Sequence, residues 1–347
     1  MRRLMLILFA VILAVSCERR PLVDLSNTHY VRIYIDEHLK NVTTGFYNES
    51  NDRPEYKSPA IMRIALTDPE TGNVRAERYL RNTGEDERGR WYDGYIVAEP
   101  GMYNVMAYNF DTESTIVSGT NSHYDAMAYT NSIASHLYSK IPSRVKSPVE
   151  NEKIVYDPDH LFVVDCGDIY VPYVEQIDSL QTQDGDWFHG ESIVQSYYLQ
   201  VRIKGMQYVS SSVALLNGMA GSAMLHGRRK NEDHEVTIYF DMNGSSSSET
   251  ADSVAVLYAT FNTFGRIDGM GNQLEITFDF LTTNGSHYSE VLDITDVFET
   301  PEAIQNQWIL IDKVIEVPKP ENGSASGGGG FQPNVGEWED INTDINI

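Results

Sequence analysis

The sequence predicts an all-β protein built from two tandem β-sandwich domains with one or two short helices. Short runs of alternating apolar and polar residues recur along most of the chain, and Gly, Pro, Asn and Asp separate them. A period of two is typical of half-buried strands. Tyrosine is abundant, at 21 residues, and aromatic and β-branched side chains suit a pleated surface. A chain of 347 residues favours two domains over one.

The N-terminus has the pattern of a secretory signal peptide. Residues 1–3 carry two arginines, and residues 4–15 are apolar, which is too short for a membrane span of roughly 20 residues. Small residues then precede Cys17, and this segment resembles the lipobox of bacterial lipoproteins, although Leu13 lies one position further from the cysteine than usual. The resemblance implies cleavage between Ser16 and Cys17 and acylation of the cysteine. An ordinary signal peptide with an incidental cysteine is the alternative.

The charge excludes several partners. The chain has 26 Lys+Arg and 50 Asp+Glu, which gives a formal net charge of −24. A field of this sign repels nucleic acid and anionic membrane surfaces, and scattered acids keep an exposed protein in solution. We therefore expect no nucleic-acid partner. Cys166 is the only other cysteine, so an internal disulfide is not expected, and we interpret it as a small buried apolar residue.

Strands are expected throughout residues 28–186, the first predicted domain, which follows a tether at 17–27. The turn Pro100-Gly101 leads into a strand with Tyr103, Val105 and Ala107 on one face. Residues 124–141 instead show a helical apolar stripe, and we expect one helix there at the edge of the first sandwich. The other expected strands of this half are 31–35, 61–66, 91–97, 153–156, 161–164 and 168–174.

A polar stretch at 181–186 is interpreted as an interdomain linker, and residues 187–347 form the second predicted domain. An Asn-Gly hairpin turn is expected at 283–286, and Pro301 suits the first position of a short helix. Beyond the glycine-rich residues 323–330, the chain ends in an alternating segment predicted to complete a sheet or to exchange with another subunit, through Ile341, Thr343, Ile345 and Ile347. The expected strands are 193–204, 212–216, 236–240, 254–261, 274–281, 288–294 and 308–317.

Several of these segments together resemble one family. They are the lipobox with residues 18–22 after it, the strand 103–108, the element Ala-Leu-Leu-Asn-Gly-Met-Ala-Gly-Ser at 214–222, and the closing residues 331–340. They are similar to Bacteroidales fimbrial anchor and fimbrillin-like lipoproteins. The resemblance implies two transthyretin-like (immunoglobulin-like) sandwiches in a non-catalytic pilus subunit or anchor, joined to other subunits by strand addition. An unpaired sheet edge offers backbone groups that a donated strand satisfies.

The resemblance also bears on processing and location. Stalk subunits of the family lose an N-terminal segment by cleavage at a basic residue, but Arg53 precedes Pro54, which hinders such a cut. We therefore expect retention of the lipid, an anchor or accessory role, and a position on the outer membrane facing outward. The two arginines after Glu18 depart from the usual acidic export signal and leave a periplasmic location open.

No residue pattern supports catalysis, a cofactor or a metal site. His-x-x-x-His and Cys-x-x-Cys spacings are absent, and we interpret Asp184-Gly185-Asp186 as a turn rather than a calcium loop. His226 beside three basic residues suggests an acidic ligand, but a solvated loop is the preferred interpretation.

The alternative function is a surface glycan-binding lipoprotein of a polysaccharide-uptake system, with Trp187 as the leading contact; a hydrolase is a third hypothesis. The other tryptophans are Trp91, Trp308 and Trp338.

Overall fold

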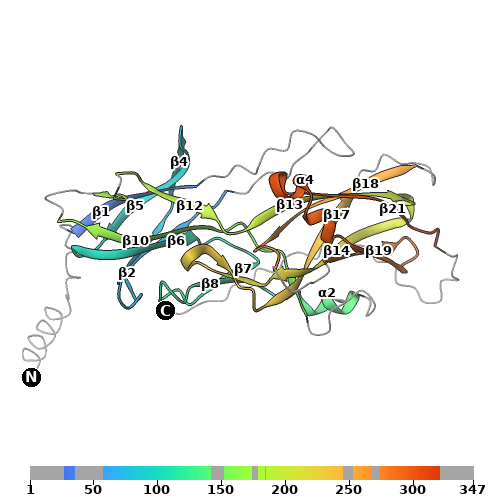
Figure 1. Cartoon of the computed structure of the whole chain (residues 1–347), viewed down its shortest axis with the longest axis horizontal. Coiled ribbons are helices and arrows are strands. Elements are labelled where there is room, and N and C mark those ends of the chain that lie inside the picture. The colour runs from blue at the N-terminus through green and yellow to red at the C-terminus, as the bar shows by residue number, and fades with distance from the viewer. Residues whose placement is uncertain are drawn as a thin grey trace, which may run out of the picture.

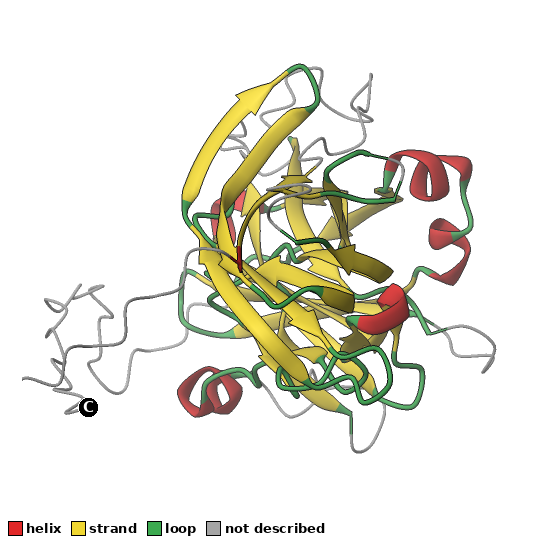
Figure 2. Ribbon diagram, turned by 90° about the vertical axis from the view of Figure 1, so that its left-hand side faces the viewer, coloured by secondary structure: helices red, strands yellow, loops and turns green. Residues whose placement is uncertain are grey.

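The fold is almost entirely made of strands, as the sequence predicts. The computed structural model describes residues 27–35, 58–141, 152–173, 179–183, 185–244, 253–267 and 274–320. The helices are short segments on the outside of the strands (Figure 2). Three α-helices occur in this part, one more than expected: α2 (Ser135–Lys140), α3 (Thr295–Phe298) and α4 (Pro301–Asn306). None of these helices has the length and apolar character needed to cross a membrane.

The first sheet contains nine strands and closes into a sandwich. Its order is β3-β2-β6-β10-β12-β1-β5-β4, with β11 beside β1. Only Arg81 separates edge strand β3 from edge strand β4, and β12 turns the corner between the layers, so the sheet folds back on itself. The strands are β1 (Thr28–Ile35), β2 (Met62–Thr67), β3 (Val74–Leu80), β4 (Asn82–Asp86), β5 (Gly89–Val97), β6 (Gly101–Asn109), β10 (Phe162–Val171), β11 (Ser179–Leu180) and β12 (Phe188–Ser192).

The second sheet contains eight strands in the order β20-β19-β14-β17-β18-β13-β21, with β9 beside β17. Its edge strands approach each other, since Lys313 Nζ of β21 lies 2.7 Å from Glu290 Oε1 of β20. The sheet therefore curls around a second core. The strands are β9 (Lys153–Tyr156), β13 (Gln195–Lys204), β14 (Val209–Ala220), β17 (Glu235–Gly244), β18 (Val254–Thr263), β19 (Glu275–Thr282), β20 (His287–Asp293) and β21 (Trp308–Glu316).

Local predictions in the second half are confirmed. Leu199, Val201 and Ile203 alternate on β13 and are all fully buried in the second core. The turn at 283–286 joins β19 to β20. Helix α4 begins at Pro301, and the Oγ1 of Thr300 accepts a hydrogen bond from the Ala303 N–H as an N-cap.

A small third sheet joins the two halves of the chain. Its order is β16-β15-β8-β7, from β7 (Thr115–Ser118), β8 (Met127–Thr130), β15 (Ser222–Met224) and β16 (Arg229–Lys230). Because β8 pairs with β15, residues from both halves share one sheet. In Figure 1, β7 and β8 lie below the middle of the long axis, where the two sandwiches meet.

A separate apolar cluster fills this junction, and we call it the junction core. It combines Met106, Tyr108 and Val163 of the first sheet with Phe264 and Ile267 from the second half. The later part of β6 and the start of β10 are consequently buried on both faces, whereas the sequence predicts one buried face for β6. The remaining buried members are Ala65, Ala126, Ala128, Leu161, Val194, Ala220, Ala223 and Leu225.

Strand β9 makes the two sandwiches interlock. It precedes β10 of the first sheet in sequence, yet it pairs in parallel with β17 of the second sheet from Lys153↔Val236 to Tyr156↔Tyr239. The chain therefore enters the second sheet, returns to the first for β10, β11 and β12, and leaves it again at β13.

Two expectations from the first half are wrong. The helix expected over 124–141 is confined to α2, because residues 127–130 form β8 and pair with β7 and β15. Helix α2 also covers the second sheet rather than the edge of the first, since its Leu137 and the flanking Ile133 and Ile141 pack in one cluster with Leu215 of β14. The expected linker at 181–186 lies between β11 and β12, and both of those strands pair with β1. The passage between the sheets falls instead at residues 193–194.

Strand β1 is a central strand of the first sandwich. It pairs over its whole length with β5 and, on its other side, with β11 and β12. Ile33 is fully buried in the first core, whereas Ile304 on α4 is 63% exposed. Replacing Ile33 with alanine therefore leaves a cavity that replacing Ile304 does not.

We predict that Ile33→Ala lowers the free energy of unfolding by about 2–5 kcal/mol. The matched variant Ile304→Ala should change it by less than about 0.5 kcal/mol. Urea denaturation followed by circular dichroism measures both. Equal effects of the two substitutions would contradict the buried position of β1.

Candidate functional site: the two poles and the junction

The two ends of the described chain lie at opposite poles of the molecule. Strand β1 is parallel to β12, β12 leads directly into β13, and β13 is parallel to β21. These strands run in one direction along the long axis, from β1 in the first sandwich to β21 in the second (Figure 1). Thr28 therefore starts at the outer end of the first sandwich, and Glu316 ends at the outer end of the second.

The first sandwich already holds its own N-terminal strand. Val31, Ile33 and Ile35 of β1 fill the first core, with exposed fractions of 2% or less. Loss of β1 would open a groove between β5 and β12, and the backbone groups of both strands would lose their partners. A chain that keeps β1 has no such groove to offer.

The loop at residues 157–160 carries the chain between the sheets. Asp159 and Thr115 bind reciprocally: the Thr115 N–H donates to Asp159 Oδ2 at 2.8 Å, and the Asp159 N–H donates to Thr115 Oγ1 at 2.7 Å. On the other side, Asn262 Nδ2 of β18 donates to the Pro158 carbonyl at 2.8 Å. The loop therefore ties the first half to the second sheet.

Two titratable groups are partly buried in this loop. Burial raises the pKa of Asp157 to about 6, against the opposing hydrogen bond from the Asn262 N–H. Burial lowers the pKa of His160 to about 4. The His160 ring lies 3.3 Å from Ser196 Oγ of β13, so it too faces the second half. The sequence gives no signal of this loop's role, because its partners are distant along the chain.

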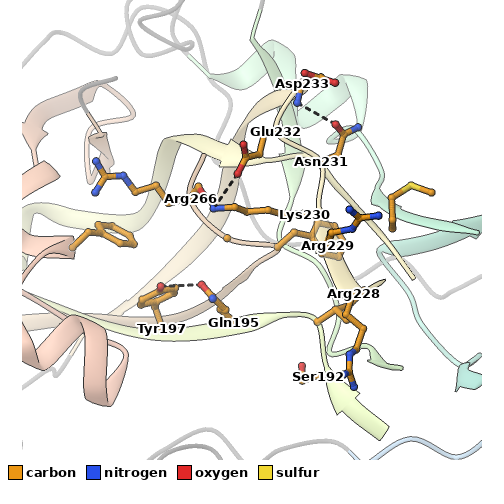
Figure 3. Close-up of a pocket in the computed structure, with 15 residues that line it drawn as sticks. Ser192, Gln195, Tyr197, Arg228, Arg229, Lys230, Asn231, Glu232, Asp233 and Arg266 are labelled. Carbon is orange, nitrogen blue, oxygen red and sulfur yellow. Dashed lines mark hydrogen bonds and ion pairs between the residues drawn. The ribbon is translucent and has the colours of Figure 1, made fainter. Parts of the chain in front are cut away.

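A basic cleft of about 1090 Å³ lies beside the junction (Figure 3). Arg228, Arg229, Lys230 and Arg266 line it, together with Tyr197 and other residues of the second half. Three of these cations are paired with carboxylates, which reduces the positive field available to an anion. The pairs are Arg228–Glu191 at 3.1 Å, Lys230–Glu232 at 3.7 Å and Arg266–Glu299 at 3.5 Å. Among the described residues that line the cleft, none is a histidine or a cysteine.

Trp187 packs against other aromatic side chains. It is half-buried and meets the Tyr30 ring edge-on, with ring centroids 5.5 Å apart and an angle of 89°. Tyr30 in turn meets Tyr95 at 61°. These rings are not coplanar, unlike the platform that stacking against sugar faces requires. Of the other described tryptophans, Trp308 is buried. The Arg32 guanidinium lies over the Trp91 ring, 4.3 Å from the centre of that ring.

Several predicted residues lie outside the described part of the chain. Ser16, Cys17 and the segment with Ile341, Thr343, Ile345 and Ile347 belong to this group. Cys166 is described: it is partly buried against the first core, and burial, followed by the charges of Asp165 and Asp168, raises the pKa of its thiol.

The fold is shared with a solved adhesin-type structure. The crystal structure titled as a "putative adhesin" from Bacteroides ovatus ATCC 8483 aligns with 89% of this chain and 99% of its own, at 22% identity and a TM-score of 0.54. The chain therefore shares the overall fold of that structure. The fimbrial anchor protein Mfa2 from Porphyromonas gingivalis also aligns, at 10% identity, over 82% of this chain and 88% of its own, with a TM-score of 0.44.

The family follows from the sequence match. The chain belongs to the family described as "Domain of unknown function (DUF5119)", whose model matches residues 16–241. A relative from Bacteroides ovatus, named "Putative fimbrium anchoring subunit Fim4B", is 25% identical over 292 residues, which cover 78% of this chain and 80% of the relative. This relative confirms the resemblance to Bacteroidales fimbrial anchor proteins.

The partly buried Asp157 and His160 of the loop at 157–160 predict two opposite pH dependences. The raised pKa of Asp157 gives stability that is present below pH 4 and lost as the pH rises through 6. The lowered pKa of His160 costs stability as the pH falls from about 6.5 towards 4. Relative to the wild type, the unfolding free energy of Asp157→Asn should therefore rise between pH 4 and pH 7, by up to about 3 kcal/mol. That of His160→Asn should fall over the same range.

Urea titrations at several pH values measure both differences. The exposed Asp233→Asn should keep the wild-type pH profile. Parallel profiles for all four proteins would show that neither group is buried as described.

Proposed function

We propose that this protein is a fimbrial anchor of the bacterial outer membrane, held by lipid on Cys17 and joined to the next subunit through its C-terminal segment. The observation that carries the proposal is the position of the two ends of the described chain. The N-terminal strand begins at one pole and β21 ends at the other. An anchor needs this arrangement, because one end has to face the membrane while the other faces the fibre.

The tether length agrees with attachment at the first pole. Strand β1 begins at Thr28, and the predicted tether covers residues 17–27. Eleven residues span at most roughly 35–40 Å when fully extended. Under the proposal the first sandwich therefore stays close to the membrane, and the second sandwich lies further from it. Lipid on one cysteine supplies enough acyl chains for stable anchoring.

The relatives support the same role. The Bacteroides ovatus relative named as a fimbrium anchoring subunit matches over four-fifths of its length, so the correspondence includes both sandwiches. A fimbrial role implies a place in the cell envelope and other fimbrial subunits as partners. It also favours a structural role over catalysis.

Strand addition is the proposed mode of joining. Because β1 completes the first sandwich, this subunit would donate a strand rather than accept one. The alternating residues 341–347 have the pattern of a donor, with Ile341, Thr343, Ile345 and Ile347 on one face. The apolar face would fill pockets of the neighbouring sheet while the backbone pairs with its open edge.

The lipid is tested by mass spectrometry of the protein isolated from membranes. We expect a mature chain that begins at Cys17 and carries acyl groups. Cys17→Ser should abolish acylation and release the protein from the membrane fraction, whereas the matched variant Cys166→Ser should leave both unchanged. A mature chain that begins after an arginine, without acyl groups, would refute the anchor proposal.

Strand donation is tested by charge substitutions on the two faces of the terminal segment. Ile341→Asp with Ile345→Asp should abolish co-purification with a co-expressed fimbrial stalk subunit, because the charges enter apolar pockets. Asn342→Asp with Asn346→Asp adds the same charge to the opposite face and should preserve the complex. The urea midpoint of both proteins should equal that of the wild type. If both double variants lost the complex, or if both kept it, donation of this segment as a strand with one apolar face would be excluded.

A further inference from the structure

A buried histidine, a carboxylate and a second histidine converge at the junction between the sandwiches. His123 Nε2 lies 2.8 Å from Asp165 Oδ1, and His226 Nδ1 lies 3.4 Å from the same oxygen. The two imidazole rings are 5.0 Å apart between centres. His123 is 2% exposed, Asp165 is 15% exposed and His226 is 41% exposed, so the cluster is closed on one side and open to solvent on the other.

The backbone holds each of the three residues in place. The His123 N–H donates to the Gly72 carbonyl at 2.8 Å, which fixes the loop before β8 against the β2–β3 turn. Asp165 lies in the middle of β10, paired with Met106 of β6. His226 follows Leu225, whose N–H donates to the Ala126 carbonyl at 2.9 Å. The cluster is therefore built on elements that packing already orders.

The second carboxylate oxygen is also occupied. The Gly227 N–H donates to Asp165 Oδ2 at 2.6 Å, and Gly227 can do so because it adopts a positive φ of 70°. The carboxylate is therefore oriented, with Oδ1 facing both histidines.

We propose that His123, Asp165 and His226 form a binding site for a divalent transition-metal ion of the zinc class. Two imidazole nitrogens and one carboxylate oxygen are a common zinc donor set. In a tetrahedral site with bonds of about 2.0–2.2 Å, donor atoms lie roughly 3.3 Å apart. The two imidazole nitrogens lie 2.8 and 3.4 Å from Asp165 Oδ1, and all three donor atoms lie within 4.8 Å of one another. Asp165 Oδ1 and His123 Nε2 therefore need to part by about half an ångström.

Further features agree with a bound cation. The Gly227 hydrogen bond to Asp165 Oδ2 is the outer-shell contact that orients a ligating carboxylate. The open side at His226 leaves room for water as a fourth ligand. The net charge of −24 attracts cations to the surface.

The ion would fasten the two halves of the chain together. Asp165 belongs to the first sheet, His123 to the loop that leads into the small third sheet, and His226 to the segment after β15 in the second half. Motif searches for metal spacing miss this site, because the three ligands are far apart in sequence and only the interlocked fold brings them together.

The test uses the purified protein without a histidine tag, titrated with Zn²⁺ by calorimetry and with Co²⁺ by visible absorption. We expect a single Zn²⁺ per chain, the visible bands of tetrahedral Co²⁺, and a Tm that rises with Zn²⁺. His226→Ala and Asp165→Asn should each weaken Zn²⁺ binding by more than about 100-fold and remove the Co²⁺ bands. His226 is half-exposed, so its substitution spares the fold.

The matched control is His234→Ala, an exposed histidine of the same half, which should bind Zn²⁺ as the wild type does. Mg²⁺ should not compete, since imidazole favours transition metals over hard cations. Wild-type-like Zn²⁺ binding by the folded His226→Ala and Asp165→Asn proteins would overturn the proposal, as would the absence of Zn²⁺ binding by the wild type.

Discussion

The burial of one apolar cluster between the two sandwiches is the constraint on which the rest of the structure depends. The junction core takes side chains from both halves, including Met106, Tyr108 and Phe264. Each large apolar side chain buried in this way contributes about 1.5–3 kcal/mol. Separation of the sandwiches would expose these groups, unpair β9 from β17 and break the hydrogen bonds of the loop at 157–160. The two sandwiches therefore behave as one body rather than as two domains joined by a flexible linker.

This interlock suits a subunit under tension. A fimbrial anchor receives force at its membrane end and at its fibre end, and the described chain begins and ends at opposite poles. Force applied along that axis passes through the junction. At the junction, three features connect the two sandwiches and would carry this force: the parallel pairing of β9 with β17, the third sheet and the proposed metal site. In the proposed role, the lipid tether and the donated strand would therefore act on one rigid element.

Local patterns predicted much of this fold, and long-range pairing explains what they missed. The alternation of Leu199, Val201 and Ile203 and the cap at Thr300 act within a few residues, so the sequence shows them directly. The apolar spacing of residues 127–130 predicts a helix, but pairing with Ser222–Met224 in the other half overrides this local preference. The His123–Asp165–His226 cluster was missed for the same reason, since only the folded chain brings these residues together.

Hydrogen exchange across a urea titration, read by mass spectrometry, tests the interlock most directly. Peptides from β1 in the first sheet, β9 at the crossing and β13 in the second sheet serve as separate probes. If the sandwiches form one cooperative body, all three should lose protection at the same urea concentration. Loss of protection in β9 well before the others, or separate transitions for β1 and β13, would contradict the account.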